Sequence, residues 1–167
     1  MRKLIYYVAS TLDGFIAHKD GTFEGFPWDD DFGEEIFEAY PETIPPHLSG
    51  KTLSRKDNKW FDTVLMGRKT YEVGLAEGIT SPYPSLQQIV FSQSMKESLD
   101  ENVTLVNENA AAFVQDLKGT AGKAIWLCGG SVLAAMLYNA DLIDEMIVKL
   151  NPVLFGEGIP LFAPSSK

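Results

Sequence analysis

The chain has 167 residues, of which 45% are hydrophobic and 22% charged, so it has the length and composition of one globular domain. These values exclude a chain disordered throughout and a multidomain assembly. With 14 Lys and Arg against 23 Asp and Glu, the formal net charge is −9. Such a charge repels nucleic acid and anionic membranes, and we expect neither as a partner.

A single cysteine, Cys128, and two histidines, His18 and His47, limit the redox and metal chemistry. One cysteine excludes a disulfide framework within the chain and is typical of a reducing compartment. These three residues have no zinc-ligand spacing, so we expect no metal site. The apolar run at residues 4–9 is too short for a signal peptide or a membrane helix and predicts a first strand. We therefore expect a cytoplasmic protein.

Apolar runs of strand length alternate with helical patterns along the chain, which predicts an α/β domain. Several runs are almost entirely apolar, as strands covered on both faces are. Other segments place apolar residues three and four positions apart, the spacing of a helix. The predicted strands are 4–9, 63–66, 88–91, 103–106, 124–128 and 145–150, and the predicted helices are 31–40, 109–118 and 131–139.

Residues 41–59 have the least regular pattern, with three prolines and a glycine among polar residues. We expect a long excursion between the first helix and the second main strand. Loops of this length are often functional, so the excursion is a candidate wall or cover of a cleft. Two interpretations stay open for its basic residues, a solvated face or a site for an anionic substrate. These residues are Lys51, Arg55, Lys56 and Lys59.

The predicted strand at 124–128 is followed by Gly129, Gly130 and Ser131, where a helix begins. Glycines permit close backbone approach, and the amides at a helix start suit a diphosphate. A tight turn that needs glycine only for its dihedral angles would explain the same residues. The G-x-G-x-x-G pattern is absent after every strand, and so is a Walker A sequence. An ordinary Rossmann site is therefore not expected.

A second predicted strand ends at Gly67, and the helix after it carries Arg68, Lys69 and Thr70 in its first turn. Cations at a helix start oppose the helix dipole. An anion shared by these three side chains would make the position a phosphate site. The alternative is that the two cations are exposed and pair with nearby acids.

Three further features have simple structural explanations. Asp13-Gly14 follows the first strand and is a strong turn signal. Cys128 lies in an apolar run, which favours a small buried filler over a nucleophile. Consecutive carboxylates at residues 29–31 are favoured at a helix start without any metal. We expect Asp31 to cap that helix.

Taken together, these segments resemble the dihydrofolate reductase fold family. They are most similar to the branch that contains the riboflavin-biosynthesis reductase domain, the RibD C-terminal domain. The resemblance runs from Leu4 to about Phe162, and the order and spacing of its motifs carry it. These motifs are STLDGFIA at 10–17, MGRKTYE at 66–72, LCGGS at 127–131, IDEM at 143–146 and NPVLFGEGIPLF at 151–162.

The resemblance implies a single domain over residues 1–167, with three layers in which helices flank a central, mostly parallel sheet of eight strands. It implies an NADPH-dependent reductase of a small heterocyclic metabolite, ribosylamino-pyrimidine-like or pterin-like. The alternative is an NADP(H)-binding sensor or orphan domain without a defined reductase substrate. The last two family strands have no counterpart after Phe162. The sheet would then have an open edge or be covered by another subunit, and we expect a homodimer.

The resemblance also implies cofactor-binding residues. The first turn after Gly67 would hold the adenosine phosphates. Gly129 and Gly130, often joined by a cis peptide in this fold, would lie alongside the diphosphate. Two residues near the first strand would flank the nicotinamide ring, and a serine after the strand at 88–91 would lie against the adenosine half. The implied residues are Ala9, Ile16, Gly67, Arg68, Lys69, Thr70, Ser92, Gly129, Gly130 and Ser131.

On the substrate side the chain departs from the family pattern. In dihydrofolate reductases an acid at a fixed distance after a Pro-Trp pair bonds the pterin, and here Gly33 stands at that position. The candidate substrate-binding residues are Trp28, Asp31 and Glu34. Asp13 is our candidate catalytic proton donor, because it follows a strand end that would face the nicotinamide. Water is the alternative donor.

Overall fold

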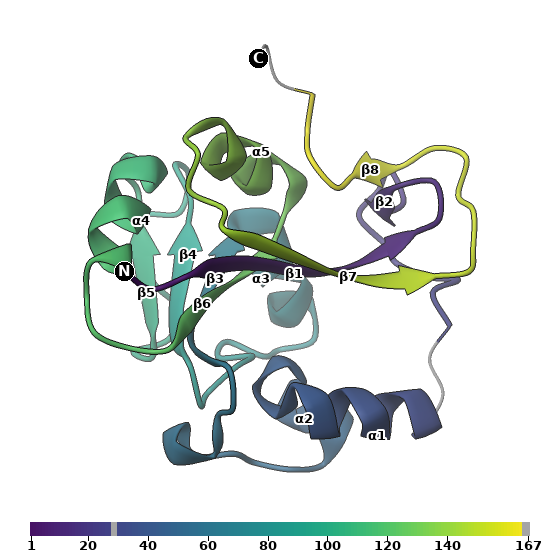
Figure 1. The fold of residues 1–167 in the computed structure, drawn as a ribbon, viewed down its shortest axis with the longest axis horizontal. Helices are drawn as coiled ribbons and strands as arrows, with labels where there is room; N and C mark the ends of the chain where they lie inside the picture. The colour runs from purple at the N-terminus through teal and green to yellow at the C-terminus, as the bar shows by residue number, and fades with distance from the viewer. Residues whose placement is uncertain (28–29, 165–167) are drawn as a thin grey trace.

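A computed structural model describes residues 1–27 and 30–164. Six strands form a central sheet in the order β5-β4-β3-β6-β1-β7 (Figure 1), and each adjacent pair is parallel. Strands β2 and β8 form a second, antiparallel sheet of two strands, which lies to one side of the central sheet. The strands are β1 Leu4–Thr11, β2 Phe15–Ala17, β3 Phe61–Gly67, β4 Gln87–Phe91, β5 Val103–Val106, β6 Ala124–Gly129, β7 Glu145–Asn151 and β8 Ile159–Pro160.

Helices cover both faces of the central sheet and complete three layers. Helices α4 and α5 pack on one face, and α3 packs on the other together with the segment that follows α1 (Figure 1). The helices are α1 Asp30–Ala39, α2 Pro46–Ser49, α3 Arg68–Ala76, α4 Ala110–Lys118 and α5 Ser131–Asn139, with 3-10 turns η1 Pro41–Thr43 and η2 Arg55–Asp57.

The side chains of β1 show why this strand is central. Leu4 and Tyr6 point into the core under α4 and α5, whereas Ile5 and Tyr7 point into the core under α3. Successive side chains of a strand face opposite sides, so a strand between two helical layers is apolar at every position. The two cores account for the continuous apolar runs in the sequence.

The predicted α/β class and the parallel central sheet are confirmed, and the central sheet has six strands rather than the eight of the family pattern. The eight strands of the described residues divide into a sheet of six and a sheet of two. Strands β2 and β8 have three and two residues, too few for a periodic pattern. Pro160 in β8 also lacks the N–H that a longer ladder needs.

Two helix starts differ from the predictions. Helix α1 begins at Asp30, so Asp31 lies inside the helix and is not its cap. Helix α4 begins at Ala110, and Asn109 is its cap, because its side-chain oxygen accepts hydrogen bonds from Ala111 and Ala112 at 3.1 and 3.2 Å. By contrast, α5 spans the predicted residues 131–139.

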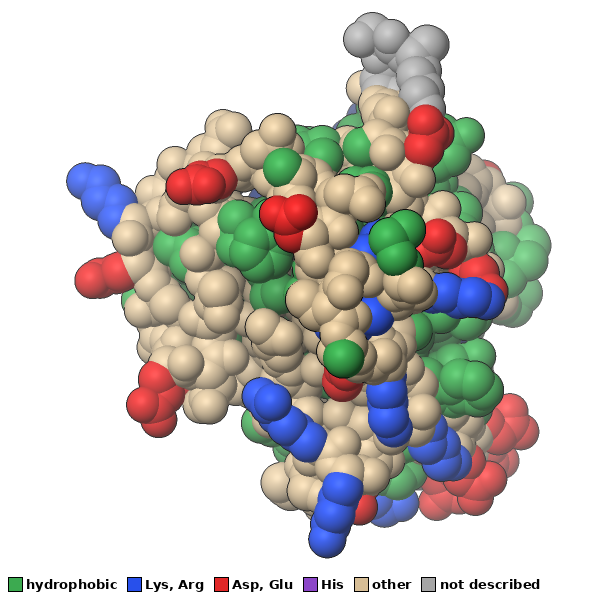
Figure 2. Space-filling model, turned by 60° about the vertical axis from the view of Figure 1, so that its left-hand side comes forward, with side chains coloured by type: hydrophobic (Ala, Val, Ile, Leu, Met, Phe, Trp, Pro, Cys, Tyr) green, Lys and Arg blue, Asp and Glu red, His purple; other side chains and the backbone are tan. Residues whose placement is uncertain are grey.

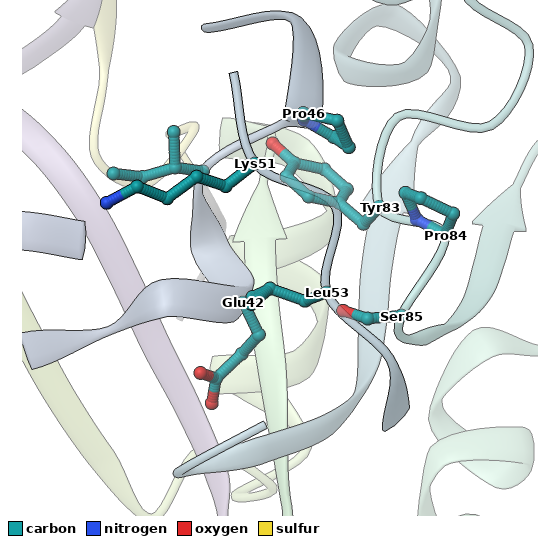
Figure 3. Close-up of a pocket in the computed structure, with 8 residues that line it drawn as sticks. Glu42, Pro46, Lys51, Leu53, Tyr83, Pro84 and Ser85 are labelled. Carbon is teal, nitrogen blue, oxygen red and sulfur yellow. The ribbon is translucent and has the colours of Figure 1, made fainter. Parts of the chain in front are cut away.

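The excursion at residues 41–59 is anchored by the buried side chain of Glu42. Its carboxylate accepts hydrogen bonds from the backbone N–H groups of Lys59, Trp60 and Phe61 at 3.2, 2.6 and 2.7 Å. Figure 3 shows this carboxylate pointing away from a small pocket beside Tyr83. That pocket holds about 10 Å³, which is room for one water molecule and not for a substrate.

The four basic residues of the excursion, Lys51, Arg55, Lys56 and Lys59, are all exposed. Lys51 lies over the Phe37 ring at 4.0 Å, and Lys59 donates to the Glu38 carbonyl. Figure 2 shows Lys and Arg side chains that stand out into solvent on one face of the molecule. These contacts favour the solvated face over a site for an anionic substrate.

Candidate functional site

A wide cleft of about 1930 Å³ runs along the carboxyl ends of the parallel strands. Its walls come from the ends of β1, β3, β4, β5, β6 and β7, from the segments after them, and from β2 and β8. Open parallel sheets bind ligands at this edge, where chain connections turn in opposite directions. Here that point lies between β3 and β6, because β3 leads to β4 on one side and β6 leads to β7 on the other.

Gly67 at the end of β3 and Gly130 after β6 lie against each other in this cleft. A Cβ atom on Gly67 would lie 3.4 Å from the Gly130 nitrogen, and one on Gly130 would lie 3.3 Å from the Thr70 hydroxyl oxygen. The Gly129–Gly130 peptide is cis, as the resemblance implies. Side chains at these positions would fill the space between the two strand ends.

Helices α3 and α5 begin at this point, and neither has a side-chain cap. Their caps are Gly67 and Gly130, which offer no side-chain hydrogen bond to the first N–H groups. In addition, the Ser131 hydroxyl is buried and has no hydrogen-bond partner among residues 1–27 and 30–164. Helix-start amides and an unpartnered hydroxyl are donors that suit phosphate oxygens.

The two cations at the start of α3 have different surroundings. Arg68 Nη1 lies 2.5 Å from the Glu72 carboxylate, one helical turn further along. Lys69 is exposed and makes no ion pair with the part of the chain that the structure describes. Thus Arg68 shows the acid pairing that the sequence left open, whereas Lys69 is available to an anion.

Ser92 follows β4 and is buried beside the cleft. Its hydroxyl oxygen accepts hydrogen bonds from the N–H groups of Ser94 and Met95 at 3.2 and 3.0 Å. The side chain therefore shapes its own turn, and the turn forms part of the cleft wall.

All of the residues predicted to bind the cofactor line this one cleft, although segments far apart in the chain supply them. They are Ala9, Ile16, Gly67, Arg68, Lys69, Thr70, Ser92, Gly129, Gly130 and Ser131. Asp13, Asp31 and Glu34 are not among its described lining residues. Trp28 lies outside the residues that the structure describes. The binding roles of these residues stay predictions.

Asp13 holds two loops together. Its carboxylate accepts hydrogen bonds from the Thr11 hydroxyl at 2.5 Å and from the N–H groups of Phe155 and Gly156 at 3.1 and 2.7 Å. The Thr11 hydrogen bond in particular holds the pKa of the Asp13 carboxyl below its usual value. A carboxyl stabilised as the anion is a poor acid at neutral pH. These contacts favour a structural role for Asp13, and its catalytic role stays untested.

Three residues that the sequence did not single out for the site, or placed elsewhere, line the cleft: Tyr83, Cys128 and Lys149. Cys128 is half-buried rather than fully buried, and its sulfur lies 4.0 Å from the Tyr83 hydroxyl. Burial raises the pKa of the Cys128 thiol to about 11, which makes it a weak nucleophile. For Lys149 the available signal is one cation among the apolar residues 146–150 of β7.

Within residues 1–27 and 30–164, no three His, Cys, Asp or Glu side chains form a group that could hold a metal ion. No helix of these same ranges is long and apolar enough to cross a membrane.

The parallel sheet, its helical layers and the paired glycines at the strand ends define a dihydrofolate reductase-like fold, a fold of reductase type. The family model of the RibD C-terminal domain matches residues 2–166. The chain belongs to this family.

Two curated proteins of Bacillus subtilis (strain 168) are similar over most of their length. The uncharacterized protein YwjB is 36% identical over 164 residues, which cover 96% of this chain and 83% of YwjB. The uncharacterized protein YyaP is 31% identical over 172 residues, which cover 96% of this chain and 80% of YyaP.

Three solved structures share the fold. A protein of Shewanella sp. PV-4 assigned to riboflavin biosynthesis has a TM-score of 0.71 at 27% identity, covering 99% of this chain and 85% of its own. A deaminase/5-amino-6-(5-phosphoribosylamino)uracil reductase of Thermotoga maritima has a TM-score of 0.61 at 16% identity, covering 99% and 50%. Dihydrofolate reductase of Enterococcus faecalis, complexed with NADP(H), has a TM-score of 0.62 at 21% identity, covering 98% and 79%. The last two show likeness of fold alone.

Proposed function

We propose that the chain is an NADPH-dependent reductase of a small heterocyclic metabolite of the ribosylamino-pyrimidine or pterin type. The observation that carries the proposal is the contact of Gly67 with Gly130 at the ends of β3 and β6, with the unpartnered Ser131 hydroxyl beside it. Two proteins of the same fold have reductase names, and the dihydrofolate reductase among them is complexed with NADP(H).

The donors at the cleft fit the phosphates of such a cofactor. The uncapped start of α5 and the Ser131 hydroxyl would bind the diphosphate, and the absence of side chains at Gly129 and Gly130 would let it approach the backbone. Lys69, together with Arg68, would bind the phosphate that distinguishes NADPH from NADH. Ala9 and Ile16 would lie against the nicotinamide, which supplies a hydride when bound.

The substrate side of the cleft is mostly apolar. Phe32, Pro45, Leu48 and Tyr83 line it, and such side chains pack against a planar ring and exclude water from it. Asp31 and Glu34 are exposed and do not line the cleft, so neither takes the position of a pterin-binding acid. This arrangement favours a ribosylamino-pyrimidine-like substrate over dihydrofolate.

Cofactor titration tests the first half of the proposal. We expect the protein to bind NADPH about ten- to a hundredfold more tightly than NADH, because one charge-assisted hydrogen bond to the extra phosphate contributes an affinity difference of about this size. NADPH fluorescence and thermal shift measure this directly. Equal affinities for the two cofactors would contradict the phosphate-binding role of Arg68 and Lys69.

Measurement of turnover tests the second part of the proposal, the reduction of a small heterocyclic substrate. NADPH oxidation is followed at about 340 nm, where reduced nicotinamide absorbs, with pterins and ribosylamino-pyrimidines as candidate substrates. Reduction of a ribosylamino-pyrimidine supports the proposal. Tight NADPH binding without reduction of any compound would instead support the alternative, an NADP(H)-binding sensor.

A further inference from the structure

Buried cations in this protein have carboxylate partners. Arg2 is 8% exposed and pairs with Asp62. Lys118 is 4% exposed, and its Nζ lies 2.6 Å from the Asp144 carboxylate. A charge taken out of water is unfavourable unless an opposite charge or hydrogen bonds compensate it.

Lys149 on β7 does not follow this rule. Its side chain is half-buried and lines the cleft, yet it makes no ion pair or side-chain hydrogen bond within the two described stretches of the chain. Its Nζ lies 4.6 Å from the centre of the Tyr7 ring. A ring face attracts a cation but does not neutralise it.

The described titratable groups beside Lys149, Tyr7 and Cys128, carry no negative charge at neutral pH. Burial raises the pKa of Tyr7 to about 12 and that of the Cys128 thiol to about 11, so both stay protonated. Burial also lowers the pKa of Lys149 itself, which is the direction expected when a cation lacks a counter-ion. An anion bound at the cleft wall would compensate such a cation.

The strand register indicates where that anion would lie. Lys149 on β7 is paired with Ala9 on β1. Ala9 is the residue that would lie against the nicotinamide, so Lys149 would lie near the reacting end of the substrate rather than a distant part of it.

We propose that Lys149 binds an oxyanion of the substrate, a carboxylate or phosphate oxygen close to the carbon that is reduced. This inference rests on the proposed function for its location, because Ala9 marks the nicotinamide position only if a nicotinamide cofactor binds. The presence of an oxyanion site at Lys149 can be tested without the cofactor.

The first test observes Lys149 itself. In protein labelled with 13C at the lysine Cε atoms, the Lys149 NMR signal is assigned by its loss in Lys149→Arg. Inorganic phosphate and acetate are added separately at constant pH, with chloride keeping the ionic strength constant. We expect a saturable shift of the Lys149 signal with at least one anion and none for exposed Lys51. The more effective anion indicates phosphate or carboxylate, and no saturable shift with either overturns the proposal.

The second test uses Cys128, the only cysteine, as a reporter inside the cleft. Iodoacetate is anionic and iodoacetamide is neutral, so the ratio of their alkylation rates reports attraction of a carboxylate to this position. Any effect of Lys149 on the thiol itself cancels in the ratio. We expect Lys149→Met to lower the ratio several-fold and Lys51→Met to leave it unchanged. An unchanged ratio in Lys149→Met overturns the proposal.

NADPH titration of Lys149→Met separates this inference from the proposed function. If wild type and variant bind NADPH equally, the cofactor site stands independently of Lys149. If neither binds NADPH while both tests above are positive, the oxyanion site stands and the proposed reductase fails. For a compound that is reduced, a variant with lower kcat and unchanged KM would overturn the binding role, because Lys149 would then act in the reaction step.

Discussion

The carboxylate of Asp13 accepts a hydrogen bond from the backbone N–H of Gly156 at 2.7 Å, which joins the turn after β1 to the segment after β7. Beside this contact, the Phe155 ring stacks on His18 with 3.9 Å between ring centres. Together with the β2–β8 pair, these contacts hold the turn after β1 and the segment after β7 against each other at the side of the cleft. One of the groups that hold these segments is therefore a carboxylate that does not itself line the cleft.

Replacement of Asp13 by Asn is expected to lower the melting temperature but leave NADPH affinity and the single-turnover hydride rate at wild-type values. The folded-state pKa of Asp13 is lowered, so its contribution to stability is present above the unfolded carboxyl pKa of about 3.9 and is lost as the pH falls through the lower folded value. Thermal melts of both proteins across acidic pH should therefore converge. A hydride rate that falls in Asp13→Asn and loses its pH dependence would restore Asp13 as the proton donor.

Arg68 and Glu72 form a matched pair of tests for cofactor choice. Arg68→Ala is expected to weaken NADPH binding by roughly 1.5–3 kcal/mol, about ten- to a hundredfold, and to change NADH binding little. Glu72→Gln removes the carboxylate at 2.5 Å and should strengthen NADPH binding, because Arg68 loses its competing partner. Parallel titrations with both cofactors measure these changes. Equal losses for NADPH and NADH in Arg68→Ala would contradict the assignment.

Gly130 distinguishes a binding role from a turn role. Its φ of −97° and ψ of −166° are extended backbone that alanine also adopts, and the added Cβ requires only a small shift of Thr70. Gly130→Ala is therefore expected to fold but to lose NADPH binding, since the Cβ would stand where the diphosphate passes. Circular dichroism and NADPH titration are measured on the same sample. A folded variant with normal affinity would contradict the cofactor site.

Cys128 is expected to react slowly with iodoacetamide at neutral pH, because the pKa of its thiol is raised to about 11 by burial. The alkylation rate should rise about tenfold per pH unit up to that value, as the thiolate fraction does. Intact mass spectrometry follows the reaction, and Cys128→Ala should retain NADPH binding. Rapid alkylation at pH 7 would show a thiolate and reopen the nucleophile interpretation.

The predicted homodimer would use the outer edge of β7, which ends the central sheet. Met146, Val148 and Leu150 are 43%, 37% and 62% exposed along this strand. An unpaired strand edge with apolar side chains favours pairing with a second chain. We expect light scattering to give a dimer for wild type and for Leu99→Glu, an exposed control, and a monomer for Leu150→Glu. A monomeric wild type would contradict the dimer.

The sequence predicts the elements of this fold best where local pattern and tertiary packing agree. Residues 124–128 and 131–139 are apolar in the arrangement that their buried positions require, and their observed bounds differ by at most one residue. The pattern fails at β2 and β8, which exist only because segments far apart in the chain meet. Similarly, Asn109 caps α4 through hydrogen bonds of its side chain, and the spacing of apolar residues does not reveal such bonds.

The candidate site divides in the same way. Glycines and cations at strand-to-helix junctions are visible in the sequence, because each junction is local, and all of these residues line the cleft. The position of Lys149 depends on the pairing of β7 with β1, a contact between residues about 140 positions apart. The contacts of Asp13 also depend on the tertiary fold, since its partners Phe155 and Gly156 belong to a distant loop.

The place of β1 in the sheet has a consequence for synthesis on the ribosome. This strand emerges before the other strands of the domain, yet its two neighbours are β6, Ala124–Gly129, and β7, Glu145–Asn151. Leu4 and Tyr6, which are fully buried in the folded protein, therefore lack the neighbouring strands that cover them until β6 and β7 have been translated. Nascent chains arrested before residue 124 would therefore expose an apolar strand, which makes them substrates for chaperones and prone to aggregate.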